Sequence, residues 1–240
     1  MLQAMAGHDP ADPASANRPV PDYRAALSGE IRGLRIGLIS HFYATDNPAN
    51  ETTRQAIAAA VRMLEDLGCS VRELRLSPLA DWAACGVMIM LAEGYAIHEA
   101  TLRERFTDYG EAFRDRMALA ALITGGDYVQ AVRRRRELAA EFATAMADLD
   151  LVITAASPSE APAIDSVSKF AILERPSLTM PFNVTGSPAM SVCCGYTVAG
   201  LPLAFQLAGK PFDEATVLNA AHAYERATPW RSIRPSLPPP

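Results

Sequence analysis

The sequence is most informative between residues 181 and 225. It reads Pro181-Phe-Asn-Val-Thr-Gly-Ser-Pro-Ala-Met-Ser-Val-Cys-Cys-Gly195, then Gly200-Leu-Pro-Leu-Ala-Phe-Gln-Leu-Ala-Gly-Lys-Pro-Phe-Asp213, then Glu214-Ala-Thr-Val-Leu-Asn-Ala-Ala-His-Ala-Tyr-Glu225. Two short apolar runs, 190–196 and 203–207, predict strands, and the glycine-containing segment between them is typical of a hairpin. A final helix is expected over 214–227, with Asp213 as its cap and Pro229 after its end.

The segment upstream of this block alternates between strand and helix patterns. Apolar runs predict strands over 34–39 and 71–76. The helix between them is indicated by a 3.6-residue apolar stripe that ends at Gly68, formed by Ile57, Ala60, Val61, Leu64 and Leu67. A strand, a helix and a strand at this spacing make a βαβ unit, which predicts parallel pairing.

Two long helices and one further strand are expected in the middle of the chain. Ser77 and Pro78 are typical of the N-cap and first position of a helix, here one that runs to about residue 105. A second helix is predicted to begin near Asp127, with Gly125-Gly126 as the turn before it, and a buried strand is predicted over 150–154. The expected fold class is therefore α/β, a mixed β-sheet flanked by helices.

Composition divides the chain into three parts. Residues 1–33 are expected to form an extended arm, because they are rich in Pro, Asp, Ala and Ser. Residues 1–6, at the start of this arm, are expected to form the last turn of a helix. Residues 34–230 are expected to form a single α/β domain that is incomplete. Residues 231–240, which end in three prolines, are expected to be a disordered tail.

Charge and residue spacing exclude several classes of function. The chain has 240 residues, a formal net charge of −5 and a pI near 5.4, and no uninterrupted apolar run approaches the roughly 20 residues of a membrane-spanning helix. With no basic signal-peptide segment at its start, the chain is predicted to be cytoplasmic and to bind neither nucleic acid nor a membrane. The four cysteines and four histidines lack the spacing of metal ligands, so no metal and no cofactor are predicted.

Two motifs suggest chemistry but have more ordinary interpretations. Arg133-Arg-Arg-Arg136 lies in a predicted helix near Glu137 and Glu141, and we interpret it as a solvated helix surface with i,i+4 ion pairs. Ser166-Val-Ser-Lys169 matches the S-x-x-K spacing of penicillin-binding enzymes, but the partner motifs S-D-N and K-T-G do not occur in the sequence. Catalysis by Ser166 and Lys169 is therefore not predicted.

The block over 181–225 resembles the C-terminal signature of the amidase-signature family. The resemblance extends upstream, because Leu149-Asp-Leu-Val-Ile-Thr154 is similar to the family's strand before a proline-rich loop. Gly7-His-Asp-Pro10 with Arg18-Pro-Val-Pro-Asp-Tyr23 is similar to the arm that follows the family's catalytic core. One departure is Ala155, where the family usually has proline. The resemblance covers nearly the whole chain and implies the C-terminal half of an amidase-signature fold.

The same resemblance implies serine acyl transfer. In the family a serine attacks an amide carbonyl, and the proton passes through a second serine to a neutral lysine, while backbone N–H groups hold the oxyanion. Those residues precede the arm with which this chain begins, and neither Lys169 nor Lys210 lies in the family's catalytic context. No catalytic residue is therefore assigned, and this chain alone is expected to be inactive.

Three residues of the block, Phe182, Asn183 and Thr185, are the predicted substrate-binding residues. Asn183 and Thr185 are short polar residues in an apolar stretch, where a buried polar group needs a partner from the backbone or from the substrate. A packing role is the alternative interpretation for each of them.

Three functional hypotheses follow from the resemblance. The first is part of an amide hydrolase that cleaves a small carboxamide once an N-terminal amidase half completes it. The second is a non-catalytic remnant or small-molecule-binding module of the same fold, and the third is an inactive, truncated gene product. Strand edges and apolar faces that a missing half would cover predict self-association of the chain on its own.

Overall fold

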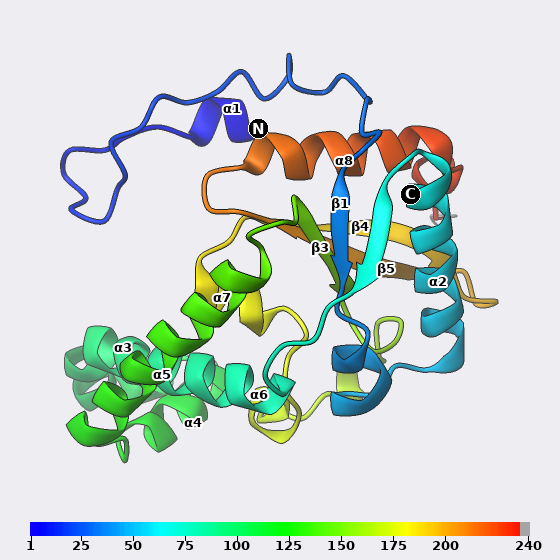
Figure 1. The fold of residues 1–240 in the computed structure, drawn as a ribbon. Helices are drawn as coiled ribbons and strands as arrows, with labels where there is room; N and C mark the ends of the chain where they lie inside the picture. Colours follow the sequence, from blue (N-terminus) through cyan, green and yellow to red (C-terminus); the bar gives the residue numbers. More distant parts are fainter. Residues whose placement is uncertain (236–240) are drawn as a thin grey trace, which may run out of the picture.

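The computed structural model describes residues 1–235, and at its centre is a five-stranded sheet with the strand order β2-β1-β3-β5-β4 (Figure 1). The strands are β1 (Arg35–Leu38), β2 (Ser70–Glu73), β3 (Leu151–Ala155), β4 (Ala189–Tyr196) and β5 (Pro202–Gly209). β1 pairs in parallel with β2 and β3, whereas β5 pairs antiparallel with β3 and β4. The predicted mixed sheet, with its parallel βαβ unit and its C-terminal hairpin, is confirmed.

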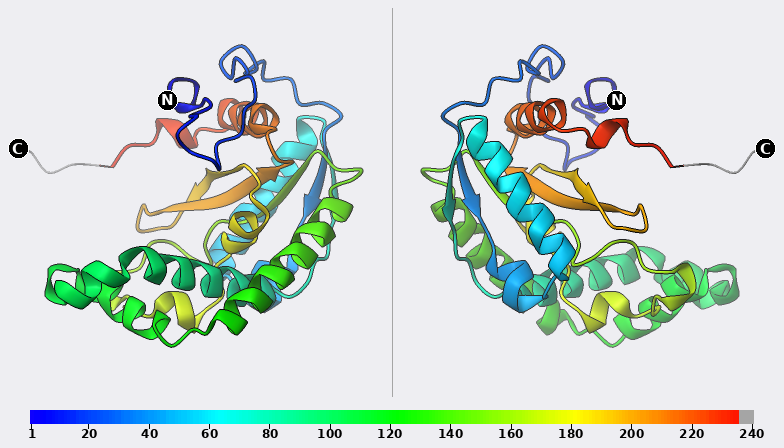
Figure 2. Two further views of the ribbon diagram at one scale, coloured as in Figure 1. Left: turned by 90° about the vertical axis from the view of Figure 1, so that its left-hand side faces the viewer. Right: turned by 90° about the vertical axis from the view of Figure 1, so that its right-hand side faces the viewer.

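Helices cover both faces of this sheet. They are α1 (Leu2–Met5), α2 (Glu51–Asp66), α3 (Leu79–Glu104), α4 (Glu111–Ala120), α5 (Gly125–Ala145), α6 (Ala171–Glu174), α7 (Met180–Thr185) and α8 (Glu214–Ala227). Single turns lie at 42–46, 106–108, 164–166 and 230–232. Figure 2 shows the sheet between one layer that contains α2 and α8 and another that contains α3, α5 and α7. The α/β class is confirmed.

The start of α2 shows why the βαβ unit forms where the sequence predicts it. The side chain of Asn50 accepts a hydrogen bond from the Thr53 N–H at 2.8 Å and so caps the first turn. Ile57 and Leu64 are fully buried on the face toward the sheet. After the helix, Gly68 takes a φ of +94°, a left-handed conformation that favours glycine, and the chain turns into β2.

Two predicted helix starts are corrected by the structure. α3 begins at Leu79 with Pro78 at the N-cap, and Ser77 does not cap it, because its N–H and hydroxyl both donate to Glu141. The Leu79 N–H is satisfied instead by the Asp46 carboxylate at 2.8 Å, from a segment distant in sequence. α5 begins at Gly125, two residues before the predicted start, because Thr124 and Asp127 form a reciprocal capping box around the two glycines.

Three helices, α4, α6 and α7, are absent from the sequence prediction. α4 packs against α3 through a small separate cluster of Leu91, Leu102, Met117 and Ala120. α7 lies at the start of the 181–225 block, where residues such as Gly186 and Pro188 are typical of turns. Pro181 stands at its start and Gly186, with a φ of +72°, ends it, so the same residues that predict turns delimit one short helix.

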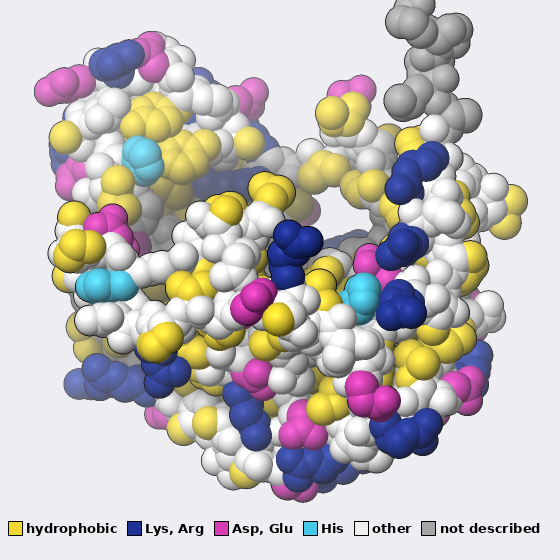
Figure 3. Space-filling model, turned by 90° about the horizontal axis from the view of Figure 1, so that it is seen from above, with side chains coloured by type: hydrophobic (Ala, Val, Ile, Leu, Met, Phe, Trp, Pro, Cys, Tyr) yellow, Lys and Arg dark blue, Asp and Glu magenta, His cyan; other side chains and the backbone are white. Residues whose placement is uncertain are grey.

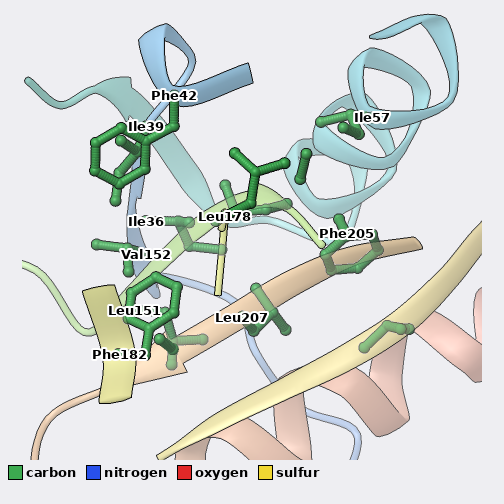
Figure 4. Close-up of a cluster of buried hydrophobic side chains, with 14 of the residues drawn as sticks. Ile36, Ile39, Phe42, Ile57, Leu151, Val152, Leu178, Phe182, Phe205 and Leu207 are labelled. Carbon is green, nitrogen blue, oxygen red and sulfur yellow. The ribbon is translucent and has the colours of Figure 1, made fainter. Parts of the chain in front are cut away.

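The main core is formed by side chains of the sheet and of the helices that pack on it, α7 among them. Figure 4 shows Phe182 of α7 beside Leu151 and Leu207 of the sheet, and Phe205 farther along β5. Phe205 is fully buried and meets the Tyr224 ring edge-on, with centroids 5.0 Å apart. Phe212 of the same block does not belong to this core, because its side chain is half exposed and the Arg18 guanidinium lies 4.2 Å from the ring centroid.

The N-terminal arm crosses over α8 without forming a strand (Figure 1). Asn219 of α8 holds the end of the arm, accepting from the Gly29 N–H at 2.8 Å and donating to the Glu30 carbonyl at 2.9 Å. At the other end of the chain, the turn at 230–232 extends into the segment expected to be disordered. Residues 236–240 lie outside the described part of the chain, and the proposed boundaries at 33 and 231 stay predictions.

Helix α3 is both long and apolar. By length and composition alone it matches a membrane-spanning helix, with a mean hydropathy of 1.2 over 18 residues of which 28% are buried. A single such helix is weak evidence for a membrane span, because core helices of other proteins have the same composition. α3 also packs against α5 and α7. Much of the apolar surface of α3 is nevertheless uncovered.

Candidate functional site

Helix α7 is the element on which the candidate site is built, and a buried glutamine holds its beginning against the sheet. Gln206 of β5 is 2% exposed, and its amide donates to the Ala155 carbonyl at 2.9 Å and to the Leu178 carbonyl at 2.8 Å. One side chain therefore ties the segment before α7 to β3. The Arg135 guanidinium of α5 donates to the Val184 carbonyl at 2.9 Å and fixes the other end.

Two pockets lie on either side of α7, and Asn183 lines both. The first, of about 260 Å³, lies between α7 and β4 and is largely polar; it is lined by Thr179, Phe182, Asn183, Ser187, Ala189, Met190, Ser191 and Gln206. The second, of about 470 Å³, lies between α3, α5 and α7. Its walls are mainly apolar, with Met90, Ile97 and Met180 among them, and it also contains Glu93 and Arg135.

The structure places the three predicted substrate-binding residues differently. Phe182 is buried against Phe142, with centroids 6.1 Å apart, and only contributes to the wall of the polar pocket. Thr185 is half-buried and its hydroxyl is satisfied locally by the Phe182 carbonyl and the Ser187 hydroxyl. Asn183 is exposed, so it is not a buried amide in need of a partner, contrary to the prediction.

The exposure of Asn183 makes it the residue of the three that is free to meet a ligand. Its side chain forms no hydrogen bond to residues 1–235, and it stands at the junction of the polar and apolar pockets. A carboxamide side chain carries both donors and acceptors and can pair with both ends of a substrate amide. The role of Phe182 in the structure is to support the pocket wall.

The S-x-x-K motif is not a catalytic pair in this fold. Ser166 donates its hydroxyl to the Ala163 carbonyl at 2.7 Å, in a single turn that ends before Lys169. The Lys169 amine forms ion pairs with Asp115 at 2.5 Å and Glu111 at 2.7 Å. The hydrogen bonds that the Lys169 amine donates to Asp115 and Glu111 raise the pKa of Lys169, whereas a lysine that serves as a base needs a lowered pKa.

The arginine run is a helix surface, as predicted, although its partners differ. Arg134 pairs with Glu137 at i,i+3 and with Asp81 of α3. Arg135 turns to α7, and Glu141 is occupied by Ser77 rather than by an arginine. These contacts place the run at the junction of α3, α5 and α7, where Arg135 enters the apolar pocket.

The remaining reactive side chains do not form a second centre. Burial raises the pKa of Cys194 to about 12 and that of Cys69 to about 11, so both thiols are poor nucleophiles. Within residues 1–235, no three His, Cys, Asp or Glu side chains lie close enough together to hold a metal ion. The chemistry that the described residues offer is recognition of a small polar group beside an apolar pocket.

Gln206 and Arg135 are site residues that the sequence did not reveal. Gln206 is a polar residue in an apolar strand, with Phe205 and Leu207 on either side of it. A glutamine buried in such a strand was the signal that could have pointed to a structural role. Arg135 was seen only as part of a charge run. Neither position points to α7 without the fold, because their partners lie 28 and 49 residues away in sequence.

Replacing Gln206 by leucine is expected to lower the free energy of unfolding by about 2 kcal/mol, because two buried carbonyls lose their donors. Hydrogen exchange at residues 182–185 should also accelerate, since α7 loses its tie to the sheet. Denaturant unfolding measures the first effect and exchange mass spectrometry the second. Ser191→Ala, at the cross-strand partner of Gln206, is the control and should change neither. Equal stability of Q206L and the wild type would contradict this role.

Comparison with known proteins agrees with the geometry. A sequence profile of the family described as Amidase matches residues 1–218. The A subunit of glutamyl-tRNA(Gln) amidotransferase from Chloroflexus aggregans is 33% identical over 99% of this chain and 53% of its own length. An amidase from Pseudomonas putida is 34% identical over 99% of this chain and 52% of its own length. The chain thus spans about half the length of these relatives.

Solved structures show the same relationship. A protein from a vestigial complex that reveals the origins of an s-triazine catabolic enzyme matches 94% of this chain and 50% of its own, with a TM-score of 0.80 and 28% identity. A bacterial aryl acylamidase of the amidase-signature enzymes matches with a TM-score of 0.77 at 22% identity, which shows the fold alone. The chain belongs to the amidase-signature family and corresponds to the C-terminal half of its longer members.

Proposed function

We propose that the chain supplies the C-terminal half of an amide hydrolase that cleaves a small carboxamide by serine acyl transfer. The observation that carries this proposal is the family match over residues 1–218, combined with coverage of only half of relatives such as the Pseudomonas putida amidase. The nucleophile, the second serine and the lysine would come from an N-terminal half, on the same polypeptide or on a separate chain.

The pockets on α7 support a division of labour between the two halves. The polar pocket offers the side chains of Thr179, Asn183, Ser187 and Ser191 to a ligand, and its volume of about 260 Å³ suits a small carboxamide. The adjoining apolar pocket is wide enough for the rest of an acyl group. A nucleophile held by the N-terminal half would attack from the open side, with the substrate oriented by α7.

The proposal is tested by completing the enzyme. The 240-residue chain is coexpressed with the part of the Pseudomonas putida amidase that precedes the matched half, and hydrolysis of a small chromogenic anilide is measured. We expect turnover only when both parts are present, and loss of turnover when the serine nucleophile of the added part is replaced. A stable complex that binds carboxamides without turnover would overturn the proposal in favour of a binding module.

In the completed enzyme, Asn183→Ala is expected to lower kcat/KM about tenfold, the loss of one hydrogen bond to the substrate. Stability should stay unchanged, because Asn183 is exposed and makes no bond to residues 1–235. Steady-state kinetics and thermal unfolding measure the two effects. Thr185→Val is a matched control, since its hydroxyl bonds only locally. A fall in melting temperature with unchanged kinetics would return Asn183 to a structural role.

The cytoplasmic location stays a prediction. So do the absence of nucleic-acid and membrane partners and the self-association of the isolated chain.

A further inference from the structure

A cavity of about 600 Å³ lies between the N-terminal arm and the start of α8, and it shares no residue with the two pockets on α7. Arm residues between 6 and 23 form most of its wall, and Phe212 and Glu214 form the rest. Its volume lies in the range of small-molecule sites, and the wall is mostly apolar, with Pro19, Val20 and Pro21 in it. Figure 3 views the molecule from above, the side on which the arm lies in Figure 1, and shows acidic and basic side chains interspersed. The groups that line the cavity therefore decide what it binds, rather than a broad field of one sign.

One wall of the cavity carries a buried hydroxyl without a partner. Tyr23 is 8% exposed, and its N–H donates to the Gln3 side chain at 2.8 Å, which holds the residue in place. Within residues 1–235 the Tyr23 hydroxyl forms no hydrogen bond, although a buried phenol usually finds one. The unpaired side-chain atoms that are fully sealed in that part of the chain belong to His41 and Thr53, so the Tyr23 oxygen is accessible. Burial, and next the charge of Glu214, raise the pKa of Tyr23, so its hydroxyl keeps the proton at neutral pH and can donate it.

Phe212 reaches the cavity in a backbone conformation that phenylalanine rarely takes. The Asp213 N–H donates to the Lys210 carbonyl at 3.0 Å, which closes a β-turn with Pro211 and Phe212 at its centre. Phe212 has a φ of +65°, and within residues 1–235 it is the one residue other than glycine with a positive φ. Glycine is usual at this position of a turn, because it has no Cβ. The ring is half exposed and adds little to the core, but it forms cavity wall and lies under the Arg18 guanidinium, 4.2 Å from the ring centroid.

Two side chains of opposite charge line the cavity and do not pair with each other. Within residues 1–235, neither Arg18 nor Glu214 forms an ion pair or a side-chain hydrogen bond. Phe212 covers one face of the guanidinium, and the N–H donors along its edge stay free for a planar acceptor such as a carboxylate. The Glu214 carboxylate can accept from a cationic donor such as an ammonium group. A ligand that satisfies both side chains carries a carboxylate and an ammonium group, with an apolar part that suits the rest of the wall.

We propose that this cavity binds a free α-amino acid with an apolar side chain. Arg18 receives the ligand carboxylate through the edge of its guanidinium, and the Tyr23 hydroxyl donates to the same group. Glu214 accepts from the ammonium group, and the apolar side chain lies on Phe212 and the prolines of the arm. The site uses residues of this chain alone, and its existence does not depend on the proposed function.

Equilibrium dialysis of the 240-residue chain against L-phenylalanine tests the site, because it measures binding to monomers and oligomers alike. We expect saturable binding with a Kd of about 1 mM or below. Hydrocinnamate lacks the ammonium group and phenethylamine lacks the carboxylate. Each should bind at least about tenfold more weakly than phenylalanine, because one charged hydrogen bond is lost. Absence of saturable binding of phenylalanine, or equal binding of the three compounds, would overturn the proposal.

Two variants assign the charges. Arg18→Gln should weaken the binding of phenylalanine and of hydrocinnamate about tenfold and leave that of phenethylamine unchanged. Glu214→Gln should weaken phenylalanine and phenethylamine and spare hydrocinnamate. Arg24→Gln, at an exposed arm residue outside the cavity, is the matched control and should bind phenylalanine like the wild type. Wild-type affinity of R18Q and E214Q for phenylalanine would contradict the site.

Two further variants separate binding from stability. Tyr23→Phe removes only the unpaired hydroxyl, so it should weaken phenylalanine binding without lowering the melting temperature. Phe212→Gly relieves the positive φ, so it should also weaken binding without lowering the melting temperature. Lower melting temperatures with unchanged affinity in both variants would show that the two side chains serve only the fold, and the proposal would fail.

Discussion

The 240-residue chain alone is expected to hydrolyse a simple anilide no faster than the uncatalysed reaction, at least about 10⁶-fold below a completed enzyme. The physical reason is the geometry of its one serine–lysine motif. The Ser166 hydroxyl donates to a backbone carbonyl, and Lys169 is held as a cation by Asp115 and Glu111. Neither group can activate the other as a nucleophile. A continuous spectrophotometric assay at high protein concentration measures the rate.

The controls for this assay are Ser166→Ala and Lys169→Ala, which should leave the background rate unchanged. Turnover that disappears in either variant would show that the S-x-x-K motif is catalytic in solution despite its geometry. Turnover that persists in both would place catalytic machinery elsewhere in the chain. Either result would contradict the assignment of no catalytic residue.

Phe205→Ala is expected to lower the free energy of unfolding by about 4 kcal/mol, the cost of removing a large aromatic side chain from a closed core. Phe205 is fully buried between the sheet and α8, where Tyr224 packs on it edge-on. Such a loss is a large part of the roughly 5–15 kcal/mol that stabilises a domain. Chemical denaturation monitored by circular dichroism measures the change.

Phe212→Ala is the matched control, because it deletes the same atoms from a half-exposed position. Its cost is expected to be below about 1 kcal/mol, since the ring loses mainly its contact with Arg18. Equal losses for the two variants would mean that the sheet and α8 do not form the core described above. That result would also mean that α7 and its pockets do not rest on this core.

The sheet was predictable because its strands carry local signals. β1, β3 and β5 are short apolar runs bounded by turn residues, and the stripe on α2 has a regular period, so burial and pattern agree. α7 was not predictable, because a six-residue segment that contains a proline and is followed by a glycine fits a turn as well as a helix. What fixes it as a helix is tertiary: Gln206 and Arg135 hold its two ends from distant strands and helices.

The candidate site was only partly predictable for the same reason. Phe182, Asn183 and Thr185 stand in the right element, but their sequence pattern does not reveal that only Asn183 faces outward. Exposure on a helix depends on which face the neighbouring layers cover, and α3 and α5 settle this for α7. The start of α3 shows the same limit. Ser77 is a good local candidate for the cap, but it bonds to Glu141, and the Leu79 N–H donates to Asp46 instead.

The proposed division of labour is that this chain shapes the substrate pocket while another half performs the covalent step. Its most direct test is the intact mass of both parts after the coexpressed complex has reacted with the chromogenic anilide and been quenched in acid. We expect one acyl group on the added N-terminal part and an unchanged mass for the 240-residue chain. An acyl group on the 240-residue chain itself would contradict it.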